Sequence, residues 1–322
     1  MTLNFVCKIL LFIAINKTIT SWRYISLRKT QILMNSSIIK KNNNKQCIIS
    51  SKNNQIYCNS KANIFIKDNE FLSNKKVVTI SPGGLKGFYL LGIMAYIKEK
   101  YNVDNLVYSG ASAGSWTSLF MCYKGDTNKF IYNLLDYNLL KIRSIPEMEY
   151  FMKYKLLTNY KDSDFDLRRL FIGVTTLKYL YPLTNIVSDF ESLEDAINCC
   201  IASSHIPLIT GGITNRFHNM YTYDGGFGKY PYLNTLDTLI HISPGMWEEI
   251  NKRKKKNGFI SSTIESLRKF SEFFSRSKNN LLELFDNGYQ DAKQNKEYFD
   301  SIFEKKRENE DNEFDDDGII EI

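Results

Sequence analysis

A chain of 322 residues is too long for a small disulfide-stapled domain and is enough for one large domain or two. Apolar residues make up 43% and charged residues 24%, which excludes general disorder and a collagen-like chain. Residues 1–67 hold 11 of the 42 Lys and Arg residues and no acidic residue, so the net charge of +7 arises there. Residues 68–322 carry 31 basic and 35 acidic side chains, and this balance argues against nucleic-acid binding by the folded body.

The two ends of the chain differ in composition from its body. Residues 3–15 are apolar but shorter than the roughly 20 residues that a membrane span needs. They fit the apolar core of a secretory signal. Residues 16–67 are basic and rich in Asn, Ser and Lys, which fits an organelle transit peptide, plastid-type included, and also a plain unstructured extension. Residues 308–317 contain seven acids. We therefore expect a leader at 1–67, a folded domain at 68–300 and a disordered acidic tail at 301–322.

The body alternates short apolar runs with helix-like segments. In chain order we expect a strand at 76–81, a helix at 88–97, a strand at 106–108, helices at 113–123, 127–142 and 148–157, strands at 171–175 and 183–188, a helix at 193–203, strands at 221–223 and 238–243, and helices at 260–276 and 279–300. This alternation predicts an α/β domain with a largely parallel central sheet.

A Gly-Ala-Ser-Ala-Gly motif at Gly110–Gly114 follows the second predicted strand and precedes a helix. In this setting a sharp turn exposes the hydroxyl of Ser112, and Gly110 and Gly114 let neighbouring backbone approach closely. The helix N-terminus supplies amides that favour a developing oxyanion. The motif predicts a nucleophilic serine, although outside this setting the bare pattern would be typical of a structural turn.

A nucleophilic serine needs a base, and the three histidines are poor candidates. His205 precedes Pro207 at a helix end, His218 lies in a polar turn, and His241 lies in an apolar run typical of a buried core histidine. A Ser–His–Asp triad is therefore disfavoured. The sequence contains no CxxC pair or Cys/His ligand cluster, so neither a zinc site nor redox chemistry is predicted.

Two further motifs adjoin predicted strands. The loop Pro82–Gly87 (Pro-Gly-Gly-Leu-Lys-Gly) lies between a strand and a helix, where its amides can face an anion. Pro82 breaks a dinucleotide-binding pattern and the Lys-Ser/Thr pair of a P-loop is missing, so an oxyanion loop is the better interpretation. Asp224-Gly225-Gly226 ends a strand, and alone it would be typical of a tight turn.

Together, the loop, the serine motif and the Asp motif resemble the patatin-like phospholipase family in their order and spacing. Three more segments are similar to that family and to its adiponutrin-like branch: Phe88–Gly92, Ser203–Pro207 and Gly288–Ala292. Lys86 departs from the pattern, since it stands where Arg is common. The resemblance covers roughly residues 76–300 and implies a three-layer α/β/α domain with a nucleophile elbow.

The resemblance also implies an activity, that of a serine lipid acyl hydrolase of the phospholipase or triacylglycerol lipase type. Its catalytic dyad would be Ser112 and Asp224, with no cofactor. The implied oxyanion and motif residues are Gly83, Gly84, Leu85, Lys86, Gly87, Ala113, Gly110, Gly114, Gly225 and Gly226. A catalytically silent lipid-binding homologue and an acyltransferase that uses the same acyl-enzyme are the alternatives.

A lipid substrate implies contact with a membrane or a lipid-droplet surface. Five consecutive cations could be drawn to anionic headgroups at about 1 kcal/mol each, although a solvated loop has the same composition. These residues are Lys252, Arg253, Lys254, Lys255 and Lys256. We therefore expect a lipid partner and peripheral membrane association, and the sequence indicates no nucleic-acid partner.

Overall fold

The computed structural model describes residues 49–50, 55–58, 70–142, 144–178, 181–228, 230–233, 238–248, 250 and 280–306. The chain divides into two units, residues 1–46 and 47–322, and every described residue belongs to the second. Several predicted features lie outside the described residues, namely most of the leader, the basic run Lys252–Lys256, the helix at 260–276 and the acidic run at 308–317.

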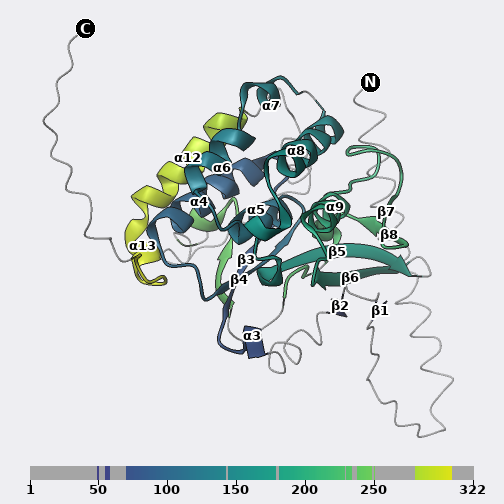
Figure 1. The fold of residues 1–322 in the computed structure, drawn as a ribbon, viewed down its shortest axis with the longest axis horizontal. Coiled ribbons are helices and arrows are strands. Elements are labelled where there is room, and N and C mark those ends of the chain that lie inside the picture. Colours follow the sequence, from purple (N-terminus) through teal and green to yellow (C-terminus); the bar gives the residue numbers. More distant parts are fainter. Residues whose placement is uncertain are drawn as a thin grey trace, which may run out of the picture. The chain divides into compact units, whose positions relative to one another are not determined.

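A mixed β-sheet with helices packed against it forms this unit, so the fold class is mixed α/β (Figure 1). The strand order is β1-β2-β6-β5-β4-β3-β9, and β8 pairs with both β5 and β7. The strands are β1 (Ile49–Ser50), β2 (Gln55–Cys58), β3 (Lys76–Ile80), β4 (Leu106–Ala111), β5 (Leu170–Lys178), β6 (Tyr181–Ser188), β7 (Asn215–Phe217), β8 (Met220–Tyr223) and β9 (Thr238–Ile242).

Parallel pairing joins β9, β3, β4 and β5, whereas β6, β2, β1 and the β7–β8 hairpin pair in antiparallel fashion. The prediction of a largely parallel sheet is therefore wrong for the antiparallel strands, which make up about half of the sheet. Only two residues separate Lys178 at the end of β5 from Tyr181 at the start of β6. A connection this short joins antiparallel strands, because a parallel crossover needs a dozen or more residues.

The sheet also begins earlier than the domain boundary expected at residue 68. Strand β2 pairs with β6 from Gln55 opposite Ser188 to Cys58 opposite Asn185, and β1 pairs with β2. Strand β2 reads Gln-Ile-Tyr-Cys, which lacks the alternation of polar and apolar residues that identifies a strand from sequence. The pairing is decided instead by the edge of β6, whose unpaired backbone groups accept another strand.

The described helices are α3 (Glu70–Ser73), α4 (Gly87–Lys100), α5 (Ala113–Cys122), α6 (Thr127–Leu134), α7 (Tyr137–Lys141), α8 (Ile145–Asn159), α9 (Leu193–Ser203), α12 (Leu281–Gln294) and α13 (Lys296–Asp300). The predicted helix at 127–142 is two helices because Asp136 caps the N-terminus of α7, accepting from the amides of Asn138 and Leu139. None of the described helices combines the length and the hydropathy that crossing a bilayer requires.

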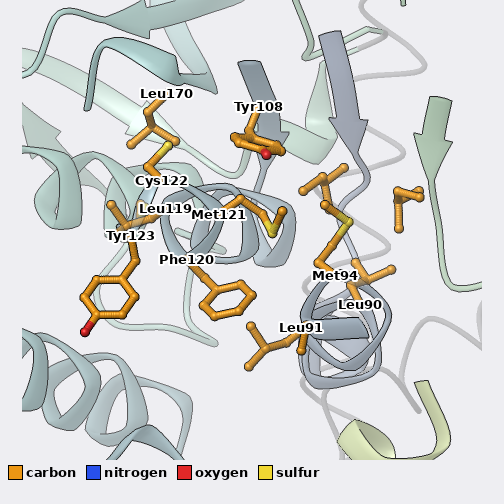
Figure 2. Packing of buried hydrophobic residues seen from close by; sticks show 14 of the residues in the cluster. Leu90, Leu91, Met94, Tyr108, Leu119, Phe120, Met121, Cys122, Tyr123 and Leu170 are labelled. Carbon is orange, nitrogen blue, oxygen red and sulfur yellow. The ribbon is translucent and has the colours of Figure 1, made fainter. Parts of the chain in front are cut away.

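Side chains alternate between the two faces of the sheet. One face carries the large hydrophobic cluster, to which α4, α5 and α9 contribute. Figure 2 shows part of it, with Phe120 and Met121 of α5 on the side of Leu91 and Met94 of α4. On the other face, Val77, Val107, Phe171 and Ile186 form a smaller cluster with Leu72 of α3. Within the described residues, the second helical layer of the expected α/β/α arrangement thus consists of one short helix.

Helix α12 packs on α4 through a close backbone contact. A Cβ added at Gly288 would lie 2.0 Å from the carbonyl oxygen of Tyr89, and one at Gly92 would lie 2.0 Å from that of Phe285. The Tyr89 hydroxyl donates to Asp291 at 2.5 Å. The Gly288–Ala292 segment is therefore the part of α12 that contacts α4. Close packing of the two helices explains why this segment has a glycine and a small residue.

We predict that Gly288→Ala destabilises the protein by about 1–3 kcal/mol, since the new methyl group must push α12 away from α4. This cost exceeds the improvement of up to about 1 kcal/mol that alanine brings to a helix. The measurement is urea unfolding, with Asn287→Ala, on the exposed side of α12, as the control. Equal or higher stability of Gly288→Ala would contradict the close contact.

Candidate active site

Two strand ends meet along one edge of β5. Strand β4 runs parallel to β5 and reaches it with Ala111 opposite Gly173. Strand β8 runs antiparallel and reaches the same edge with Tyr223 opposite Thr175. The carboxyl ends of the two strands therefore face each other, with one residue of β5 between their last partners. Ser112 directly follows the end of β4, and Asp224 directly follows the end of β8. The pairing with β5 therefore brings these two residues together.

The Ser112 hydroxyl donates to Asp224 Oδ2 at 2.6 Å, and the amide of Gly226 donates to Asp224 Oδ1 at 2.6 Å. Both Ser112 and Asp224 are 5% exposed. Burial raises the pKa of Asp224 to about 6, while the two hydrogen bonds act in the opposite direction. A carboxylate with this pKa is a stronger base than an ordinary aspartate and is still ionised at neutral pH.

The backbone of Ser112 is held in an unusual conformation at the turn from β4 to α5. Its φ of 53° is positive, which is strained for a residue with a side chain. Its amide donates to Ser203 Oγ at 2.8 Å, and Ser203 Oγ donates to the Gly173 carbonyl at 2.7 Å. Its carbonyl accepts from the amide and the hydroxyl of Ser115. These contacts from α9 and α5 hold the serine in position.

Glycines are required here because backbones approach closely. A Cβ on Gly114 would lie 2.2 Å from the Ile80 carbonyl oxygen, and one on Gly110 would lie 2.1 Å from that of Gly114. A Cβ on Gly225 would lie 2.2 Å from the Gly173 carbonyl oxygen. The motif glycines therefore allow β4, α5 and the Asp224 turn to pack against the neighbouring strands.

The glycine-rich loop lies beside the serine. A Cβ on Gly87 would lie 2.7 Å from the Cβ of Ala113, so the N-termini of α4 and α5 meet. The Lys86 amide already donates to the Gly83 carbonyl, and that of Gly87 donates within the 3-10 turn. The first amides of such turns have no partner within the turn. The amides of Gly84, Leu85 and Ala113 are therefore the candidate oxyanion donors.

An apolar pocket opens from this point, and Gly84, Leu85, Gly87, Ser112 and Ala113 line it. Its walls come from four helices. They include Phe88 and Leu91 of α4, Trp116, Leu119 and Phe120 of α5, Phe130 and Leu134 of α6, and Ile145, Met148, Glu149, Met152 and Leu156 of α8. Sequence reasoning missed these wall residues, because each helix shows only an apolar face that is equally typical of core packing.

The histidines have partners away from the serine hydroxyl. His218 Nε2 pairs with Asp195 at 2.7 Å. His241, expected in the core, lies exposed with its Nδ1 2.8 Å from Thr79 Oγ1. It is exposed because it alternates along β9 with the buried Ile240 and Ile242 and therefore lies on the opposite face. His205 is buried and contributes its carbonyl oxygen, which accepts from the Asp224 amide at 2.7 Å. Asp224 is thus the carboxylate that accepts from the serine hydroxyl.

Of the remaining predicted residues, Gly83 begins the loop turn, and Lys86 does not line the pocket in the described structure. The basic run Lys252–Lys256 lies outside the described residues. In the described part of the chain, no group of three or more His, Cys, Asp or Glu side chains is arranged to hold a metal ion. The site therefore offers a serine, a carboxylate, backbone amides and an apolar pocket.

Comparisons with known proteins add little. No family model and no curated protein matches the chain. Among solved structures, the chain is similar to VipD from Legionella pneumophila, with 14% sequence identity and a TM-score of 0.39, over 71% of this chain and 67% of that one. At this level the likeness carries no argument about the site.

We predict that Ser112 reacts covalently with a fluorophosphonate, and that its labelling rate rises with pH through about 6. The reason is that Asp224 must lose its proton before it can accept one from the serine, and burial raises its pKa to about 6. Labelling is therefore expected above this pH and lost below it. The measurement is the labelling rate against pH, with Asp224→Asn as the control. An inflection near pH 4, or a flat profile, would contradict the assignment.

Proposed function

We propose that this chain is a serine lipid acyl hydrolase of the patatin-like type, with Ser112 at a nucleophile elbow and Asp224 as its base. The observation that carries the proposal is the 2.6 Å hydrogen bond between the serine hydroxyl and a buried carboxylate at the start of an apolar pocket. A pocket lined mostly by apolar side chains fits a fatty-acyl chain better than a polar or charged substrate.

In the proposed reaction, Ser112 Oγ attacks the ester carbonyl while Asp224 takes the serine proton. The amides of Gly84, Leu85 and Ala113 stabilise the oxyanion, each contributing about 10²–10³ in rate. Asp224 then protonates the leaving alcohol, which departs and leaves an acyl-enzyme. A water molecule, deprotonated by Asp224, attacks the acyl carbonyl and releases the fatty acid. The proton on Asp224 finally returns to the serine.

Exposed apolar residues beside the pocket support contact with a lipid surface. Thr210 lines the pocket, and its loop presents Leu208 and Ile213, which are 50% and 70% exposed. The loop is ordered by its own hydrogen bonds, with the Leu208 amide donating to the Gly212 carbonyl and the Ile206 amide to Thr210 Oγ1. An ordered loop that exposes large apolar side chains beside a lipid pocket fits insertion into a lipid surface.

We predict that the full chain releases fatty acid from lipid vesicles and that Ser112→Ala abolishes this release. Asp224→Asn should lower the rate by about 10²–10⁴, the usual contribution of a general base. The matched control is Ser118→Ala in α5, the helix that follows Ser112. The Ser118 hydroxyl is buried and has no hydrogen-bond partner among the described residues. Release that persists in Ser112→Ala would refute the serine mechanism.

The two alternative functions give different results in the same assay. An acyltransferase would form a new ester when an acceptor alcohol is added and would release little free fatty acid. A silent lipid-binding homologue would bind vesicles without releasing fatty acid and without labelling of Ser112. Products are measured with and without the acceptor.

We predict that Leu208→Asn combined with Ile213→Ser weakens vesicle binding by about tenfold or more, since two apolar side chains no longer enter the lipid. Asn is chosen because Leu208 has a φ of 66°, which asparagine tolerates. The measurement is co-sedimentation with vesicles, with Leu208→Met combined with Ile213→Leu as the control. Hydrolysis of a dispersed short-chain ester should persist. Unchanged binding would exclude this loop from the lipid contact.

A further inference from the structure

One titratable side chain in the pocket has no role in the proposed reaction. Glu149 of α8 lines the pocket and is 6% exposed. It lies on the same face of α8 as Ile145, Met148 and Met152, which also line the pocket. Each of these neighbours is apolar, so a leucine or methionine at position 149 would complete the wall. The carboxyl group is therefore an exception that the packing of the helix does not explain.

The other polar side chains of the pocket wall are already hydrogen-bonded. Thr117 donates to a carbonyl of its own helix, Ser204 accepts from an indole N–H, and Thr210 accepts from a backbone amide. Within the part of the chain that the structure describes, no donor or cation pairs with the Glu149 carboxyl. A mostly buried carboxyl without a partner is costly to the fold. Its oxygens are not among the fully enclosed atoms that lack a partner, so a group bound in the pocket can reach them.

The charge state of Glu149 limits what it can bind. Burial raises its pKa to about 9, and the negative charge of Asp224 acts in the same direction. The group is therefore neutral at physiological pH. A neutral carboxyl offers one O–H donor and a carbonyl acceptor, and it does not attract a cation as a carboxylate would.

We propose that the pocket accepts acyl chains that carry a neutral oxygen substituent, such as a hydroxyl group, and that Glu149 hydrogen-bonds to that oxygen. This inference rests on the proposed function, since it assumes that an acyl chain occupies the pocket during catalysis. The apolar side chains around Glu149 contact the hydrocarbon, and the carboxyl supplies a polar contact that no other described group of the pocket already occupies. Glu149 would then select the substrate without taking part in bond breaking.

The experiment compares umbelliferyl esters of stearic acid with those of monohydroxystearic acids that carry the hydroxyl at successive carbons. The full chain and its variants are assayed for kcat/KM on each ester. Wild-type protein should prefer at least one hydroxylated ester over the plain ester by roughly three- to tenfold, the range of one neutral hydrogen bond. Glu149→Leu should remove this preference, and Glu149→Gln, which retains a donor and an acceptor, should keep most of it.

Two controls separate a binding role from a structural one. Met152→Leu alters the same wall without a polar change and should leave the ratio between the esters as in wild type. Fluorophosphonate labelling of Ser112 in each variant is the second control and reports an intact site.

A further test variant, Glu149→Met, also replaces the carboxyl group with an apolar side chain. It should lose the preference for the hydroxylated ester as Glu149→Leu does.

The outcomes separate this inference from the proposed function. If wild-type protein hydrolyses the plain ester but prefers no hydroxylated one, or if Glu149→Leu keeps the preference, the inference is overturned and the proposed function stands. If wild-type protein hydrolyses no ester at all, the proposed function fails and the inference fails with it.

Discussion

The hydrogen-bonded register along β5 is the constraint on which the site depends. Gly173 and Thr175 of this strand hold the ends of β4 and β8, which arrive from opposite directions. Ser112 and Asp224 are 112 positions apart in sequence, yet this register brings their side chains to 2.6 Å. A slip of one residue would turn one of the two side chains to the other face of the sheet, because successive residues of a strand point to opposite faces. Precise strand pairing is thus a condition for any chemistry at this site.

Burial gives the site its chemical character. It makes Asp224 a stronger base than an exposed aspartate, while the contacts from Ser203 and Ser115 hold Ser112 in its strained conformation. The same burial allows partial charges at the N-termini of α4 and α5 to act on a substrate without screening by water. The proposed base, nucleophile and oxyanion donors therefore all depend on tight packing at one end of the sheet.

Helix α5 links this chemistry to the pocket, because it begins at the serine and supplies part of the pocket wall. Its C-terminal end is also fixed. The buried amino group of Lys98 on α4 donates to the carbonyl oxygens of Phe120, Met121 and Tyr123. These bonds supply donors to the last carbonyls of the helix, while burial lowers the pKa of Lys98 to about 7. Helix α5 is thereby held at both ends, which fixes Ser112 in position relative to the pocket wall.

The sequence alone determined the short-range features, namely most strands and helices, the serine and Asp motifs and the close-packed glycines, because these depend on local propensity and on the tight turns that only certain residues permit. Tertiary structure decided the rest. The antiparallel half of the sheet and the strand Gln55–Cys58 depend on which edges meet, and the residues of that strand show no alternation of polar and apolar side chains. The pocket is built from side chains of four helices, so no single segment reveals it. Glu149 reads as an ordinary polar residue in sequence. Only the packing of α8 shows that its carboxyl lies in an apolar wall, since burial is a property of all the neighbours together.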